Sequence, residues 1–235
     1  MRNSAAYAEI KYLAKVNNAM YLLDEIFKNH QQDYSGRFCL RMQRGLSWLR
    51  KAKDLDEDVD LKFVSLWIAF NAIYAENLHE IFDEDQQHLR QFLQTLHDCD
   101  QDRRIEYCVW EYCAETIANL ANNPYVDQKL WDFRNKKIDE ETWKQHFATE
   151  RVRIQEALLH HQTIELLLII FGRFYTVRNQ LIQGGSTYNS ALMRKHLKAA
   201  CEILMKLLTQ FMHVLLEHSR ELDRDKPFYP MVQVC

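Results

Sequence analysis

Glycine and proline are scarce in this chain, which has five Gly and three Pro among its 235 residues. Sandwiches and barrels of β-strands use these residues at their many turns, so the scarcity argues against an all-β fold. The chain is 47% hydrophobic and 27% charged, a balance that excludes a disordered tail. Its length is enough to bury a sizeable core without disulfides or a structural metal. We therefore predict an all-α globular protein.

Paired cysteines of the C-x-x-C type are absent. The six cysteines are dispersed through segments with helical patterns: Cys39, Cys99, Cys108, Cys113, Cys201 and Cys235. This dispersal argues against a disulfide framework or a zinc knuckle, so we expect reduced thiols. His161 and Glu165 are four residues apart and could hold a metal on one helix face, but no further ligand follows at a recognisable spacing. We predict no metal and no cofactor.

Long apolar runs are absent as well. The longest purely apolar run, Leu166–Phe171, has six residues, whereas a helix needs about 20 to cross a bilayer. The first thirty residues lack the basic start, the apolar stretch and the cleavage site of a secretory signal. We therefore expect a cytoplasmic protein without a membrane partner.

A strong excess of positive charge is also missing, since the formal net charge is -3 at pH 7. This value excludes a polycation that binds nucleic acid over its whole surface. The charge is unevenly distributed, however. Residues 171–235 contain nine Lys and Arg and five Asp and Glu, a net charge of +4, which leaves -7 for the rest of the chain. A local anion-binding face in the C-terminal part is compatible with this distribution.

Apolar residues recur at spacings of three and four in several segments, which is the spacing of one helix face. It predicts helices over five ranges: 4–30, 37–53, 61–74, 163–182 and 190–218. The segment 61–74 is apolar nearly all round, so we expect protein to surround it. Asn71 lies within that segment. We expect a buried amide there, which either ties helices together or organises a polar site.

Residues 84–160 have a different composition, with many charged residues, Gln and His, and a helix break at Asn122-Asn123-Pro124. We predict three or four more exposed helices, inserted between core elements. Aromatic and basic residues alternate there and could stack on single-stranded bases, although a local core covered by long charged side chains is the commoner arrangement. We interpret the acidic run 54–60 as a connector whose Asp residues cap the next helix rather than as a metal-binding loop.

A polar string, residues 174–185, ends the most apolar predicted helix. Asn179 and Gln183 are four residues apart and share a face, and Arg178 directly precedes Asn179. An arginine in such a helix either pairs with a carboxylate or faces a cleft at the surface, because its charge is too costly to bury alone. The residues alone leave two interpretations open: a salt-bridged helix end, or an anion-binding site.

The same residues resemble a known motif. Arg178 and Gln183 occupy the two positions of the Arg-x4-His motif of the HEPN superfamily, with Asn directly after the Arg. Residues 44–52 leading to 66–74, and the end 226–230, resemble a large bacterial branch of the superfamily, the Apea-like one. The order and spacing of these strings together make the resemblance specific.

The resemblance covers residues 36–83 and 162–232 and implies an antiparallel HEPN-type helical bundle. In this interpretation, residues 36–235 form the HEPN-like domain, with a helical insertion at about 84–160. Residues 1–35 supply an N-terminal helix that packs on the bundle.

HEPN domains usually dimerise, and many are metal-independent endoribonucleases of toxin–antitoxin, CRISPR and phage-defence systems. The resemblance therefore implies RNA, a second copy of the chain, and an antitoxin or other defence protein as partners. By the same resemblance, Arg178 binds the phosphate, Asn179 orients the site and position 183 transfers protons.

Gln183 departs from the motif, because a glutamine side chain has no titratable proton near neutral pH. Loss of a general acid or base typically lowers the rate by about 10²–10⁴-fold. We therefore predict a weak or inactive ribonuclease. His196 follows the Gly184-Gly185 turn and is a poor substitute. The alternative is a non-catalytic HEPN module that binds RNA, a nucleotide or another protein.

Overall fold

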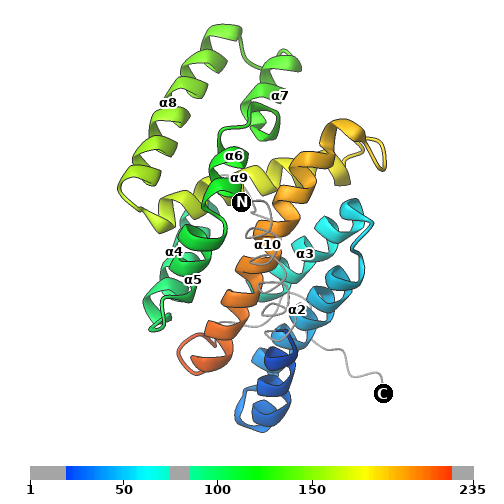
Figure 1. Cartoon of the computed structure of the whole chain (residues 1–235), viewed down its shortest axis with the longest axis vertical. Coiled ribbons are helices and arrows are strands. Elements are labelled where there is room, and N and C mark those ends of the chain that lie inside the picture. The colour runs from blue at the N-terminus through cyan, green and yellow to red at the C-terminus, as the bar shows by residue number, and fades with distance from the viewer. Residues whose placement is uncertain (1–19, 75–84, 224–235) are drawn as a thin grey trace, which may run out of the picture.

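The computed structural model describes residues 20–74 and 85–223. The structure is about 81% helical, with no strand in the described ranges, which confirms the predicted all-α fold. Of the predicted helix over 4–30, residues 20–30 are described and are helical, and the short 3-10 helix η1 (Gln31–Asp33) follows them. Figure 1 shows α10 through the middle of the molecule, with α2 and α3 on one side and α4 to α6 on the other.

The first core layer is the hairpin of α2 (Gly36–Asp54) and α3 (Val59–Tyr74). The Ser35 hydroxyl begins α2 by accepting a hydrogen bond from the Phe38 backbone N–H at 3.1 Å. A Cβ atom at Gly45 would lie 2.8 Å from Cγ2 of Ile73 and 3.0 Å from Cε of Met212. Glycine at this position therefore allows α2, α3 and α10 to pack closely.

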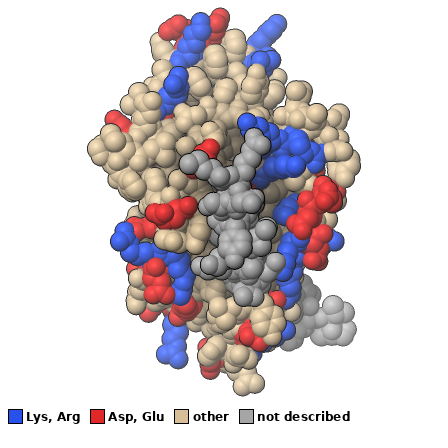
Figure 2. Space-filling view, in the orientation of Figure 1, with Lys and Arg blue, Asp and Glu red and all other residues tan. Residues whose placement is uncertain are grey.

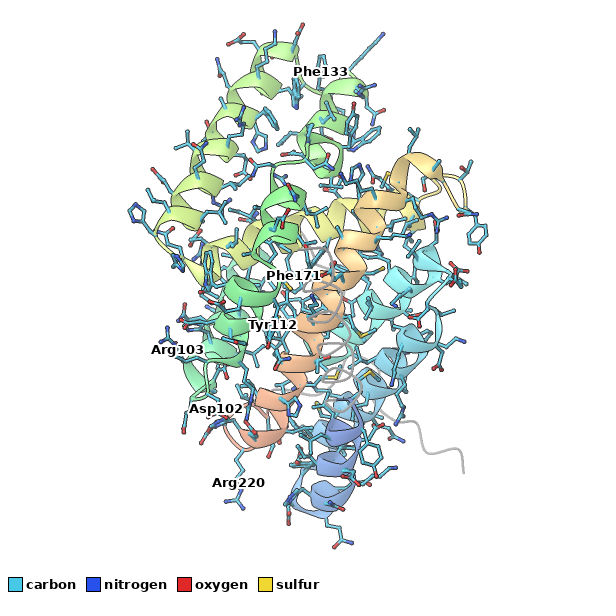
Figure 3. All side chains as sticks on the ribbon, viewed as in Figure 1. Asp102, Arg103, Tyr112, Phe133, Phe171 and Arg220 are labelled. Carbon is cyan, nitrogen blue, oxygen red and sulfur yellow. The ribbon has the colours of Figure 1, made fainter. Side chains whose placement is uncertain are left out.

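Two longer helices complete the core, α9 (Thr163–Ile182) and α10 (Ala191–Glu217). The rings of Phe70 and Phe171 lie 4.6 Å apart and those of Phe63 and Phe174 lie 6.4 Å apart, so α3 and α9 run antiparallel. Figure 3 labels Phe171 in the centre of the molecule. Burial of each such ring contributes about 1.5–3 kcal/mol, so these aromatic contacts fix α9 against α3.

The helix α10 is long and apolar enough to cross a membrane. Its most apolar part is 78% buried inside the described structure. A core helix of a globular protein meets the same criterion, so α10 alone is weak evidence for a membrane span.

The inserted region divides into two parts with different burial. Its first part comprises α4 (Asp85–Cys99), α5 (Arg104–Tyr107), the π-helical segment η2 (Cys108–Tyr112) and α6 (Ala114–Ala121). Apolar side chains of this part belong to the main core: Phe92, Leu93, Leu96, Ile105, Val109, Ile117 and Leu120. The expected exposure of the whole region is therefore corrected, because helical periodicity places these apolar residues on one buried face.

The second part projects from one end of the molecule in Figure 1. It comprises the 3-10 helix η3 (Pro124–Val126), α7 (Gln128–Arg134) and α8 (Glu140–Leu159). The break predicted at Asn122-Asn123-Pro124 is confirmed, since α6 ends at Ala121 and η3 begins at Pro124. Few residues of α7 and α8 are buried: Leu130, Ile154 and Ala157.

Aromatic residues of the projecting part contact one another. The rings of Phe133 (labelled in Figure 3) and Trp143 stack at 5.6 Å, and those of Trp143 and Phe147 stack at 5.8 Å. The indole N–H of Trp131 donates to the Tyr125 carbonyl oxygen at 2.9 Å. These contacts favour a small local core over a surface on which nucleic-acid bases stack.

Candidate functional site

The three residues of the motif lie together in the last turns of α9. Arg178 and Asn179 are half-buried, and Gln183 is exposed at the C-cap. The Gln183 backbone N–H donates to the Asn179 carbonyl oxygen at 3.0 Å. Gly184 has φ +71, a left-handed conformation that glycine adopts readily and that ends the helix. The apolar segment and the glycine pair thus place all three side chains at the end of a core helix.

Arg178 has a polar partner but no acidic one within residues 20–74 and 85–223. Its Nη1 donates to Oδ1 of Asn179 at 2.9 Å. The salt-bridge interpretation of Arg178 therefore finds no carboxylate in the described ranges. A guanidinium carries five N–H donors in a rigid fork, so one bond to Asn179 leaves donors that suit a planar or tetrahedral oxyanion.

Arg178 belongs to a stripe of side chains on one face of α9. Tyr175, Arg178, Asn179 and Ile182 follow the i, i+3, i+4, i+7 spacing of a single helix face. The ring of Tyr175 lies 6.4 Å from that of Trp67 on α3, so the stripe begins against α3. The stripe ends at Ile182, which is 53% exposed. Arg178 and Asn179 lie between these ends, at the boundary of the core.

Asn71 does not join this group. Trp67 on α3 contacts Tyr175 on α9. Along α3, Asn71 lies one turn after Trp67. Along α9, Arg178 lies about one turn after Tyr175. Because α3 and α9 run antiparallel, these two turns lead in opposite directions. Asn71 is half-buried, which corrects the expectation of a buried amide: its side of α3 is not fully covered in the described structure.

His196 is held on a different side of α9. The Asn123 amide donates to Nδ1 of His196 at 2.7 Å, and the Tyr125 ring stacks on the imidazole with centroids 6.4 Å apart. Gln180 donates to the Tyr125 carbonyl oxygen at 3.1 Å. Since Gln180 is two residues from Arg178, the two side chains point to nearly opposite sides of the helix. This arrangement does not offer His196 as a substitute for the missing histidine at position 183.

The pair considered as metal ligands at the other end of α9 is engaged elsewhere. The Glu165 carboxylate binds Arg90, and also Arg153 at 3.3 Å. The His161 ring lies 4.3 Å from the ring of Trp110. The charge of the carboxylate is thus already balanced, and the structure does not bring these two residues together as a metal site.

A buried charged cluster centred on Arg173 was not predicted from the sequence. Its Nη1 donates to Oδ2 of Asp127 at 2.6 Å, its Nη2 to Oε2 of Glu150 at 3.4 Å, and its Nε to the Ala121 carbonyl oxygen at 3.2 Å. Burial opposes ionisation of Asp127, but the hydrogen bond from His146 and the charge of Arg173 prevail and lower its pKa to about 2. The signal in the sequence was Arg173, a charged residue in the middle of an otherwise apolar stretch of the helix.

Basic side chains gather near the candidate site. Figure 2 shows Lys and Arg over the N-terminal part of α10, where Lys195 and Lys198 are exposed. Arg194 lies 3.8 Å from the buried Asp60, at the end of the acidic connector. Asp58 in that connector accepts a hydrogen bond from the Leu61 backbone N–H at 3.0 Å, as expected for a helix cap.

Large apolar side chains are exposed around the turn between α9 and α10. The exposed fraction is 53% for Ile182, 70% for Tyr188 and 87% for Leu192. Ile182 lies one turn beyond the half-buried Arg178 on α9, so this end of the helix is a candidate contact region.

The chain was compared with protein-family models, with curated proteins and with solved structures, and none of them matches it.

Proposed function

We propose that this chain is a HEPN-type, RNA-directed protein of the toxin or phage-defence kind, with its site at the C-terminal end of α9. Arg178 binds a phosphate of the RNA, and cleavage is weak because Gln183 stands where a histidine is required. The observation that carries the proposal is the half-buried Arg178, oriented by Asn179 and without a carboxylate partner in the described ranges.

Asn179 defines the direction of the guanidinium. Its Oδ1 accepts one N–H of Arg178, which restricts the rotation of a long side chain that would otherwise lose entropy on binding. The remaining N–H groups can contact a phosphate in the bidentate manner that makes arginine effective at such sites. Partial burial strengthens this contact, because the effective dielectric constant is lower than in bulk water.

Gln183 limits the chemistry. Cleavage of RNA by an internal 2′-hydroxyl needs one group to remove the hydroxyl proton and another to protonate the leaving oxygen. A glutamine amide donates and accepts hydrogen bonds but does not transfer protons near neutral pH. Gln183 is exposed at the helix end, so replacing it should not disturb the core.

A second copy of the chain is part of the proposal, since the active site of HEPN ribonucleases is shared between protomers. The exposed Ile182, Tyr188 and Leu192 support a contact at this surface. Sedimentation of a monomer at assay concentrations would contradict the shared site.

A cleavage assay on mixed cellular RNA in EDTA tests the proposal. We expect Gln183→His to raise the cleavage rate by about 10²–10⁴-fold over the unchanged protein. Adding Arg178→Ala to Gln183→His should abolish the gain. Lys129 is an exposed lysine on α7, and adding Lys129→Ala to Gln183→His should leave the gain intact. Cleavage that survives Arg178→Ala would contradict a role for this site.

The non-catalytic alternative is favoured by one observation, the glutamine itself. It predicts no cleavage by any variant but retained RNA binding, with an affinity that falls as salt rises. Arg178→Ala would then weaken binding. A purely structural bundle predicts instead that RNA affinity does not depend on Arg178.

A further inference from the structure

A cysteine, a histidine and a glutamate meet where α4 and α10 end. Cys99 is the last residue of α4, His218 caps α10 and Glu221 lies in the following turn. One ligand atom from each residue lies within 4.8 Å of the other two. In Figure 3, Asp102 in the turn after α4 is labelled at the same end of the molecule as Arg220.

The backbone fixes two of these residues relative to each other. The N–H groups of Glu221 and Leu222 both donate to the His218 carbonyl oxygen, at 3.1 and 3.0 Å. Leu222 is buried and anchors the turn in the core. As a result Nδ1 of His218 lies 2.8 Å from Oε2 of Glu221.

The segment that carries Cys99 is held independently. Asp100 is buried, and its carboxylate accepts a hydrogen bond from the Ile105 backbone N–H at 2.6 Å. The guanidinium of Arg104 makes two hydrogen bonds to the carboxylate of Glu217, which tie α5 to the end of α10. The three candidate ligands are therefore brought together by contacts that do not require a metal.

We propose that Cys99, His218 and Glu221 form a zinc-binding site. Thiolate, imidazole and carboxylate are the side-chain groups that zinc takes in proteins, at bond lengths of about 2.0–2.3 Å. Ligand atoms of a zinc tetrahedron are then roughly 3.3–3.8 Å apart. Small side-chain movements, including a slight widening of the 2.8 Å contact between His218 and Glu221, would fit the observed group around the ion. Water fills the fourth position.

Zinc in this position would connect the end of α4 to the end of α10. The thiolate and the carboxylate together balance the charge of the divalent ion. Arg104 is already paired with Glu217, which offsets its charge near the site. No metal was predicted because no ligand set occurs at a recognisable spacing in the sequence, and Cys99 is far from His218 and Glu221 along the chain. The inference does not rest on the proposed ribonuclease function, and its test involves no RNA.

The experiment is a titration of the purified, metal-free protein with Zn²⁺ in competition with a chromophoric chelator. A parallel titration with Co²⁺ follows the thiolate-to-cobalt absorption band. We expect one zinc per chain and a band that requires Cys99. Cys99→Ser, His218→Gln and Glu221→Gln should each weaken zinc binding by more than about tenfold, since loss of even an outer-shell partner costs about 10–100-fold.

Two matched variants serve as controls. Cys39→Ser removes another half-buried thiol. His30→Gln disrupts an exposed pair in which Nδ1 of His30 lies 3.2 Å from Oδ2 of Asp33. No third metal-ligating residue lies beside this pair among the described residues. Both should bind zinc like the unchanged protein.

Thermal unfolding separates a lost ligand from a lost fold. Glu221 is exposed and its ion pair with His218 contributes about 0–1 kcal/mol, so Glu221→Gln should unfold at nearly the same temperature as the unchanged protein without metal. Zinc should raise the Tm of the unchanged protein more than that of the variant. The proposal is overturned if the chelator retains all the zinc, or if Cys99→Ser and Glu221→Gln bind zinc as tightly as the two controls.

Discussion

Two arginines on α9 have opposite environments although they are only five positions apart along the chain. Arg173 is 7% exposed and contacts Asp127, Glu150 and a backbone carbonyl oxygen. Arg178 is half-buried and has Asn179 as its one partner in the described ranges. Arg173 thus holds the projecting helices against α9. Arg178, on the same helix, keeps N–H donors that no described residue uses.

The largest effect that this comparison predicts is on stability at Arg173. Arg173→Ala leaves the Asp127 carboxylate buried without its main cation, so we expect the free energy of unfolding to fall by about 3–5 kcal/mol. Urea unfolding followed by circular dichroism measures this change.

The double variant Arg173→Ala/Asp127→Ala provides the control, because it removes both charges. It should recover part of the loss. A decrease of less than about 1 kcal/mol in the single variant, the range of an exposed ion pair, would contradict the assigned role of the cluster.

The same cluster predicts a pH dependence. Its surroundings lower the pKa of Asp127 from the ordinary 3.8 to about 2 in the folded protein. The lowered pKa means that the stabilisation is fully present above pH 4 and is lost as the pH falls through about 2. The contribution of the ionised Asp127 to the free energy of unfolding is on the order of 2 kcal/mol.

Unfolding free energies measured at pH 5 and at pH 2.5 in the unchanged protein and in Asp127→Asn test this point. The difference between the two proteins should shrink at the lower pH, because the stabilisation by ionised Asp127 decreases as the pH approaches its pKa of about 2. A constant difference would contradict ionisation of Asp127 in the folded state.

The smallest stability effect is expected at Arg178. Arg178→Ala removes one hydrogen bond and a cation near a helix C-terminus, so the free energy of unfolding should fall by about 0.5–1.5 kcal/mol. The affinity for single-stranded RNA should fall as well. The slope of log affinity against log salt concentration should decrease by the amount of about one phosphate contact. Fluorescence anisotropy at several salt concentrations measures the affinity, and Lys129→Ala serves as control. A stability loss as large as that of Arg173→Ala would assign Arg178 a structural role.

The helices were predictable where one local pattern decides the structure. The range 163–182 matches α9, because the segment is apolar nearly all round and a glycine with positive φ ends it. The segment 61–74 lies within α3 for the same reason. The inserted region was predicted less well, since its many charged residues masked the apolar face of α4 to α6. The HEPN assignment stays a prediction.

The sequence by itself determined that the chain is helical, where its main helices lie and that Arg178, Asn179 and Gln183 share one helix end. Local spacing and turn chemistry are sufficient for these features. Only the tertiary structure decided which charges meet. Asp127 and Arg173 are 46 residues apart, and Arg104 and Glu217 are 113 apart. The helix ends that bring Cys99 near His218 are likewise far apart in the sequence. Such pairs depend on how whole helices pack, and no short-range pattern encodes that packing.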